Sequence, residues 1–384
     1  MTTKLYYQDA YQFSFSSVVL SCTPKGENWI VILRETAFFP EGGGQPADAG
    51  TLDGAAVLDV HEKNGDILHL CTKEIPAGTI VRGEVDAETR LRRMQNHTGE
   101  HIFSGIVCGC FGCSNVGFHI GEAFMTIDYD REFTEEELRE SERLANEAVR
   151  ANLEVRCWFP DREALASISY RSKKELEGEV RIVEIPGVDC CACCAPHVRR
   201  TGEVGVVKLL EAERHRGGTR LTMLCGMDAW ENYCLRQQSV AEISVLLSAK
   251  RDQVTAAVER LLEEKEALKE KAAALSRENI SLKAEKIQET EGNLCVFLED
   301  SDEIAARELM NLLKEKCGGY AAVFFPAETG WRYCIGSTTL DMRKAASAIN
   351  AGIDGRGGGR PEMIQGRASE TREVIRQFVE KTVM

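Results

Sequence analysis

The first part of the chain alternates apolar and polar positions over short stretches, as β-strands do. Residues 13–20 and 29–33 are rich in β-branched and aromatic side chains, and a turn-forming Pro-Lys-Gly-Glu-Asn segment separates them. Similar short runs follow at 57–60, 67–71 and 79–85. Several short strands at regular spacing are typical of closed all-β units, so residues 1–88 are predicted to form a small β-barrel domain.

The pattern changes to helical spacing from residue 87 to about residue 104. A second helix is expected after Thr134, because a threonine followed by three glutamates is a typical N-cap with an acidic first turn. Strands are expected at 118–121, 124–128 and 180–185. Residues 89–228 are therefore predicted to form a mixed α/β domain.

The segment between Gly226 and Gly292 contains neither glycine nor proline. Apolar residues recur there at every seventh position, namely Tyr233, Val240, Leu247, Val254, Leu261, Leu268, Leu275 and Leu282. This repeat predicts a long helix or a helical hairpin in a coiled coil over residues 229–290. The partner position of the heptad holds Arg251, Lys265, Ala272 and Asn279, which favours a modest homodimer contact or an antiparallel hairpin over a strong zipper.

The last part of the chain, residues 291–384, has the pattern of a compact α/β domain. Strands are expected at 294–298, 320–325 and 331–335, and helices at 303–316, 342–349 and 371–381. Residues 354–361 are expected to form a loop, in which glycines accompany Arg356 and Arg360. Such a loop is either a mobile turn or a site that offers amides and guanidinium groups to a phosphate. The whole chain is thus an α+β multidomain protein.

Composition limits the classes of partner. The 384 residues carry 47 basic and 61 acidic side chains, a formal charge of −14, which argues against general coating of nucleic acid. No apolar stretch has the length of a signal peptide or a membrane span, so a cytosolic protein without membrane contact is expected. In a reducing compartment the 15 cysteines indicate metal ligation or burial rather than disulfides.

Two motifs with matching spacing suggest a metal site. His97 and His101 stand four residues apart and would project from one face of a helix, and Cys193 and His197 have the same spacing. A thiolate with three imidazoles suits tetrahedral Zn²⁺. Either motif alone can also be polar surface or a run of small buried cysteines.

Two further features have both an ordinary and a functional interpretation. The three glycines that end at Gly44 can be a flexible loop, or they can let the backbone approach a ligand closely. Arg90, Arg92 and Arg93 precede the histidines and can be a solvated face or, next to a metal site, contacts to phosphates.

Together the motifs resemble the editing half of alanyl-tRNA synthetase and its freestanding relatives, the AlaX trans-editing proteins. The resemblance rests on Glu-Gly-Gly-Gly-Gln at 41–45, Asn-His-Thr-Gly-Glu-His at 96–101, Phe-His-Ile-Gly at 118–121, and 193–198 with Thr-Gly-Glu at 201–203. The glycine-rich segment 357–366 is similar to the signature of the DHHA1 domain. The order of barrel, zinc-binding editing domain, coiled helix and DHHA1 domain resembles the long AlaX type.

This resemblance implies a hydrolase that removes serine or glycine from mischarged tRNA(Ala), with Zn²⁺ as cofactor. It implies zinc ligation by His97, His101, Cys193 and His197. The family's GGQ motif would place Gly43, Gly44 and Gln45 in the amino-acid pocket, and Thr36 is a second hydroxyl-bearing candidate there.

Two departures from the family pattern keep other functions open. Cys194-Ala195-Pro196 replaces the common Gly-Gly-Thr between the ligands, and Glu100 makes the histidine motif read as H-x-x-E-H, in which the glutamate of an inverzincin protease is the general base. The alternatives are such a protease, a tRNA-binding module with a structural zinc, and an editing protein for a tRNA other than tRNA(Ala), because threonyl-tRNA synthetase has a related zinc editing fold.

Overall fold

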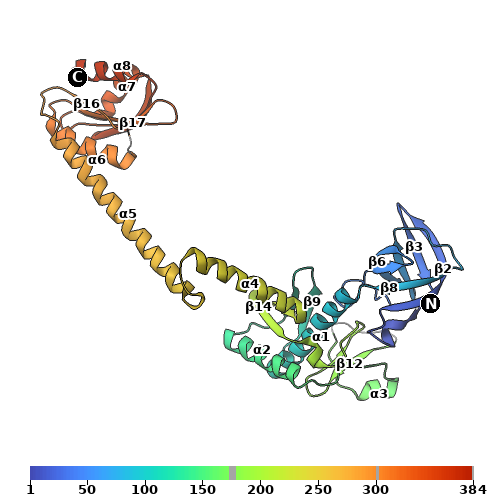
Figure 1. The fold of residues 1–384 in the computed structure, drawn as a ribbon. Coiled ribbons are helices and arrows are strands. Elements are labelled where there is room, and N and C mark those ends of the chain that lie inside the picture. The colour runs from blue at the N-terminus through green and yellow to red at the C-terminus, as the bar shows by residue number, and fades with distance from the viewer. Residues whose placement is uncertain (173–178, 300–301, 383–384) are drawn as a thin grey trace. The chain divides into compact units, whose positions relative to one another are not determined.

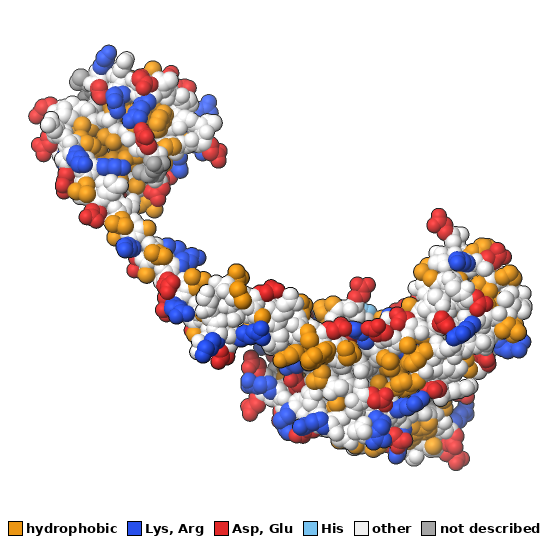
Figure 2. Space-filling model, in the orientation of Figure 1, with side chains coloured by type: hydrophobic (Ala, Val, Ile, Leu, Met, Phe, Trp, Pro, Cys, Tyr) orange, Lys and Arg blue, Asp and Glu red, His pale blue; other side chains and the backbone are white. Residues whose placement is uncertain are grey.

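The computed structural model describes residues 1–172, 179–299 and 302–382. They form two compact units, Met1–Glu242 and Ile243–Met384. Figure 1 shows the elements of each unit. On the visible face of both units, acidic and basic side chains are interspersed, so neither shows a continuous field of one sign there (Figure 2).

The N-terminal part of the first unit is a ring of six antiparallel strands. In spatial order these are β2 (Ser14–Lys25), β3 (Asn28–Leu33), β7 (Asp66–Cys71), β6 (Ala55–Lys63), β5 (Gly50–Leu52) and β8 (Ile80–Val85). Pairing of β2 with β8 closes the ring into a barrel. The alternating apolar residues, among them Val31, Leu33 and Val81, point into its core. A short parallel pair, β1 (Thr3–Lys4) with β4 (Glu35–Thr36), and a 3-10 turn at Leu5–Tyr7 lie beside it.

The remainder of the first unit is built around the helix α1 (Ala87–Phe111), which begins at the N-cap Asp86 and ends at the left-handed Gly112. Four strands form one antiparallel sheet in the order β14 (Val207–His215), β15 (Gly218–Cys225), β10 (Met125–Tyr129) and β9 (Asn115–Ile120). A smaller sheet contains β11 (Arg156–Trp158), β12 (Ile182–Ile185) and β13 (Asp189–Ala192). The helices α2 (Glu135–Arg150) and α3 (Arg162–Ser167) and a 3-10 turn at Thr201–Val204 complete it. The predicted cap at Thr134 is confirmed by a full capping box.

The predicted heptad segment contains two helices, α4 (Gly226–Leu246) and α5 (Val254–Glu285), with a 3-10 turn at Arg251–Gln253 between them. The prediction of a single uninterrupted helix is therefore wrong, and the helical hairpin stays a prediction. The first helix ends although no glycine or proline is present, because Ser248 adopts a left-handed conformation (φ 49°) and the Ala249 amide bonds back to the Ser244 carbonyl.

The heptad leucines of α5 are largely exposed. Leu261, Leu268, Leu275 and Leu282 are 50–66% exposed, and hydrophobic side chains are visible along this helix in Figure 2. A coiled-coil partner for this seam thus stays a prediction.

The second unit has a five-stranded sheet in the order β16 (Leu294–Phe297), β17 (Ala321–Pro326), β18 (Trp331–Gly336), β20 (Met363–Ala368) and β19 (Gly355–Arg360). One face packs against α5 and α6 (Glu303–Leu313) and the other against α7 (Met342–Gly352) and α8 (Arg372–Lys381). A 3-10 turn at Lys314–Lys316 follows α6.

The loop predicted at 354–361 is wrong, since its residues form the edge strand β19. The glycines there pair residue by residue with β20, and a Cβ at Gly357 would lie 2.3 Å from the Gln365 carbonyl oxygen. Close backbone approach to the neighbouring strand therefore explains the glycines.

None of the helices in the described part of the chain is both long and apolar enough to cross a membrane.

Candidate metal centre

The helix α1 carries the two histidines of the first motif. Both side chains are about as buried as core residues, at 2% exposure each. Close packing of this helix depends on Gly105, where a Cβ would lie 2.4 Å from the Val188 carbonyl oxygen and 2.6 Å from the Asp189 Cβ. A glycine at this position thus lets the turn before β13 approach the histidine face of α1.

The second pair of ligand candidates lies in the loop after β13. This loop is fixed by Arg181, whose guanidinium donates hydrogen bonds to the Cys193 carbonyl (3.0 Å) and the Ala195 carbonyl (2.9 Å). The Ala195 amide in turn points at the Cys193 sulfur at 3.5 Å. The loop therefore presents Cys193 and His197 in a defined conformation.

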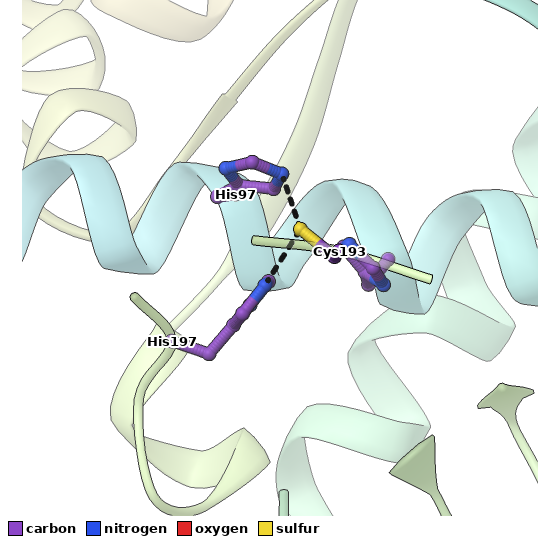
Figure 3. Close-up of side chains that lie close together, drawn as sticks. His97, Cys193 and His197 are labelled. Carbon is purple, nitrogen blue, oxygen red and sulfur yellow. Dashed lines mark hydrogen bonds between the residues drawn. The ribbon is translucent and has the colours of Figure 1, made fainter. Parts of the chain in front are cut away.

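The four predicted ligand residues meet at one point. One ligand atom from each of His97, His101, Cys193 and His197 lies within 4.8 Å of every other. The Cys193 sulfur is 3.5 Å from His97 Nε2 and 3.4 Å from His197 Nε2, as Figure 3 shows. In a tetrahedral zinc site with Zn–S of about 2.3 Å and Zn–N of about 2.0–2.1 Å, a sulfur and a nitrogen ligand lie roughly 3.5 Å apart. The residues therefore fit a zinc ion in both donor type and spacing.

Each of the three histidines is oriented through its outward nitrogen. His97 Nδ1 lies 3.0 Å from Gln45 Oε1, and His101 Nδ1 lies 2.9 Å from Asp189 Oδ2. His197 Nδ1 lies 3.0 Å from Thr98 Oγ1. Since the glutamine and aspartate oxygens accept hydrogen bonds, Nδ1 of His97 and His101 carries the proton and Nε2 faces the centre as a lone pair.

The groups around the centre are held in protonation states that suit metal ligation. Burial raises the pKa of Asp189, but hydrogen bonds from His101 and Arg171 outweigh it and hold this pKa below its usual value. Arg171 donates from Nε at 2.7 Å and from Nη2 at 2.9 Å. Burial lowers the pKa of His197 and raises that of the Cys193 thiol. The histidine is thus neutral, whereas the thiol must lose its proton when a metal binds.

A cavity of about 550 Å³ opens onto this centre. It is lined by His97, His101 and Cys193, and by Gly43 and Gly44 of the glycine loop. The volume lies within the range of about 300–1,000 Å³ that small-molecule sites occupy.

The glycine loop is docked and not free. A Cβ at Gly44 would lie 2.4 Å from the Phe118 carbonyl oxygen, and the Gly44 carbonyl accepts a hydrogen bond from the Ile120 amide at 2.8 Å. Gln45 follows at full burial, and its Nε2 has no hydrogen-bond partner among the described residues. The loop therefore fixes the glutamine against His97 and leaves it an unused donor.

Glu100 faces the same cavity from α1. Its Oε1 accepts hydrogen bonds from Ser104 Oγ (2.7 Å) and Asn115 Nδ2 (2.6 Å). Its Oε2 lies 3.8 Å from His101 Nε2. One oxygen is thus anchored by two donors, while the other points toward the ligand cluster.

Thr36 does not reach the cavity, so its predicted place in the pocket is wrong. The side chain is fully buried beside the barrel, and its hydroxyl accepts from the Phe38 amide (3.1 Å). Burial lowers the pKa of His69 to about 4, and this neutral ring directs Nδ1 at the Val31 carbonyl. The Thr36 hydroxyl then donates its proton to His69 Nε2 at 2.9 Å and has no donor left for a substrate.

Arg90 is another correction, because it is fully buried and cannot touch tRNA. Its Nε lies 2.9 Å from both oxygens of Asp48, and its Nη1 donates to the Ala10 carbonyl at 3.1 Å. This ion pair ties α1 to the barrel.

The neighbouring arginines are also engaged within the protein. Arg92 pairs with Glu88, Asp228 and Glu231, and Arg93 donates to the Ala47 carbonyl at 2.6 Å. Their side chains are only 25% and 21% exposed. A contact of either with tRNA thus has little support.

Sequence reasoning missed Asp189, Arg171 and Thr98. The sequence carries one signal for Asp189: it stands two residues before Cys191, which puts both on the same face of β13. Arg171 offers no such signal.

Three family models match parts of this chain. Residues 180–222 match the family described as "Threonyl and Alanyl tRNA synthetase second additional domain". Residues 10–89 match "tRNA synthetases class II (A)", and residues 291–384 match the DHHA1 domain.

The relatives are alanine–tRNA ligases. That of Halobacterium salinarum is 38% identical over 282 residues, which are 68% of this chain and 30% of the relative. That of Methanococcus maripaludis is 29% identical over 398 residues, 98% of this chain and 43% of the relative. The chain thus spans less than half the length of these relatives.

A solved structure, the C-Ala domain of Aquifex aeolicus alanyl-tRNA synthetase, aligns with 24% of this chain and 98% of its own length at 15% identity and a TM-score of 0.22. The family and relative matches confirm the resemblance that the motifs indicate. The chain thus carries segments that match the second additional domain and the DHHA1 domain, and it is similar over most of its own length to part of alanine–tRNA ligases.

Proposed function

We propose that the chain is an aminoacyl-tRNA hydrolase that removes serine or glycine from mischarged tRNA(Ala). The observation that carries the proposal is the cluster of His97, His101, Cys193 and His197 at the base of a 550 Å³ cavity. An aminoacyl ester is already activated, so a positioned water and a polarising cation can suffice to cleave it.

The four ligand residues would hold Zn²⁺, which when bound supplies a Lewis acid that polarises the ester carbonyl or a water molecule. The Nδ1 partners keep the imidazoles aimed at one point and prevent the ligands from rotating away. Glu100, anchored through Oε1, would accept a hydrogen bond from the attacking water with Oε2.

The amino-acid pocket would lie between the glycine loop and the ligands. Gly43 and Gly44 line the cavity, and the unused Nε2 of Gln45 is a donor for the serine hydroxyl or the ester carbonyl. A pocket built to bond a hydroxyl leaves its polar groups unpaired when alanine enters, and such sites discriminate by about 10⁴ or more. Ala-tRNA(Ala) would therefore be spared.

The second unit would bind tRNA away from the zinc site. Arg356 and Arg360 are exposed on the edge strand β19. Arg356 is in register with Arg367 on β20, and Arg332 on β18, the next in this row, is already paired with Glu303. Like charges directly opposite one another destabilise a sheet, and a phosphate backbone across this row would relieve that repulsion.

A tRNA-binding module with a structural zinc is the second candidate. It is favoured by the number of protein ligands, because four is the count of closed structural sites and catalytic zinc usually keeps a position open. The protease alternative is weaker, since Cys193 and His197 occupy the places where such an enzyme needs an acidic ligand.

The deciding experiment is hydrolysis of Ser-tRNA(Ala), Gly-tRNA(Ala) and Ala-tRNA(Ala) by the wild type and by Cys193→Ala, with the zinc content of both measured. Cys110→Ala is the matched control, because Cys110 is exposed at the far end of α1. We expect the wild type to hydrolyse Ser-tRNA(Ala) and Gly-tRNA(Ala) and to leave Ala-tRNA(Ala) intact. Cys193→Ala should lose both its activity and its zinc, whereas Cys110→Ala should keep both. A zinc-loaded wild type that binds tRNA(Ala) without hydrolysing any ester would favour the binding module instead.

A further inference from the structure

The cavity above the ligand cluster has an aromatic rim that the chemistry at its base does not use. Tyr7, from the 3-10 turn before the barrel, and Phe159, which directly follows β11, both line the cavity. Their ring centroids are 5.3 Å apart in an edge-to-face arrangement. Two segments distant in sequence thus build one aromatic wall.

The side chains that line the cavity are buried at its base and exposed at its rim. His97 at the base is 2% exposed and packs against Phe118 with 4.8 Å between ring centroids. At the rim Phe159 is 45% exposed, and Val116 on the β9 side is 63% exposed. A large apolar ring that lines a cavity at this exposure is suited to cover a flat hydrophobic group of a ligand.

This rim is rigidly connected to the ligand loop. The guanidinium carbon of Arg181 lies 5.2 Å from the Tyr7 ring centroid, and the side chain is 7% exposed. The same guanidinium bonds the carbonyls of Cys193 and Ala195. Arg181 therefore fixes the distance between the aromatic wall and the ligand cluster.

We propose that Phe159, supported by Tyr7, is the stacking surface for the purine base of the terminal nucleoside whose ribose carries the ester. The proposal rests on the proposed function, because it takes the substrate to be a 3′-aminoacyl ester. With the ester at the ligand cluster, only the ribose ring separates it from the base, so the base must lie toward the rim of the same cavity. Aromatic rings are the usual partners of unpaired bases, since every base has a π-face.

The test compares the zinc-loaded full chain with Phe159→Ala and Phe159→Trp in hydrolysis of Ser-tRNA(Ala). Phe124→Ala is the matched control, since Phe124 is equally exposed, at 47%, and does not line the cavity. We expect Phe159→Ala to raise KM about tenfold, equivalent to about 1.4 kcal/mol, with kcat changed less than about twofold. The tryptophan variant should restore KM, and the control should match the wild type.

A binding measurement keeps the two proposals separate. The probe is a non-hydrolysable nucleoside, 3′-deoxy-3′-(L-serylamino)adenosine, titrated calorimetrically beside its abasic analogue. Phe159→Ala should weaken binding of the adenosine compound about tenfold and leave the abasic one unchanged. Equal affinity of wild type and variant for the adenosine compound would overturn the stacking role, whether or not the chain hydrolyses tRNA. Failure of the wild type to hydrolyse Ser-tRNA(Ala), with base-dependent binding intact, would overturn the proposed reaction alone.

Discussion

The substitution Asp189→Asn tests the outer partner of His101. Asp189 Oδ2 accepts from His101 Nδ1, and both oxygens accept from Arg171. An asparagine has the same shape but only one acceptor oxygen, so its NH2 group must face a guanidinium N–H in either orientation, and the imidazole N–H as well in one of them. Removing a hydrogen-bond partner of a metal-binding histidine typically lowers metal affinity by 10- to 100-fold, which corresponds to about 1.4–2.8 kcal/mol.

The assay is zinc competition with a chromogenic chelator, followed by hydrolysis of Ser-tRNA(Ala) at saturating zinc. We expect zinc affinity to fall by about 10- to 100-fold, and a smaller defect in hydrolysis once zinc saturates the site. Asp128→Asn is a matched control, because Arg220 bonds Asp128 from Nε (2.7 Å) and Nη2 (2.8 Å) with the same geometry and no ligand histidine takes part. A folded Asp189→Asn variant with the zinc affinity of the control would refute the reasoning.

Three further predictions address the rest of the chain. Reversing the charge at Arg356 and Arg360 should raise KM for Ser-tRNA(Ala) at least tenfold with little change in kcat, and an unchanged KM would argue against tRNA contact at β19. If the exposed seam of α5 pairs two chains, light scattering should find a dimer that Leu268→Glu converts to a monomer; a monomeric wild type would contradict this. Arg90→Met leaves the Asp48 carboxylate buried without its cation and should destabilise the first unit by about 3–5 kcal/mol in urea unfolding, whereas loss below about 1 kcal/mol would contradict the buried ion pair.

The sequence predicts best what depends on local spacing. The i, i+4 separation of His97 and His101 implies one face of α1, and the structure brings both together with Cys193 and His197. Asp189 could not be assigned in the same way, because its role depends on how closely α1 packs at Gly105. That contact joins segments 84 residues apart and leaves no local pattern.

The errors have a common physical origin in tertiary context. Arg90 belongs to a run of arginines that, from sequence alone, is expected to be solvated. In the structure the buried carboxylate of Asp48 neutralises its charge. The glycines of β19 favour a loop by intrinsic propensity, and pairing with β20 overrides that preference. Ser248 ends α4 through a left-handed conformation that serine adopts rarely, so the heptad pattern gives no warning of the break.

The three partners of the ligand histidines come from three separate parts of the first unit: Gln45 from the barrel's glycine loop, Thr98 from α1 and Asp189 from β13. A metal that fixes the three imidazoles would therefore also restrain these three side chains, because each of them is hydrogen-bonded to the Nδ1 atom of one imidazole. Since Gly43 and Gly44 form a cavity wall next to Gln45, the shape of that wall depends on the orientation of His97. In the proposed function, zinc binding and the shape of the amino-acid pocket would thus be coupled through His97, and a substitution at Gln45 should change zinc affinity.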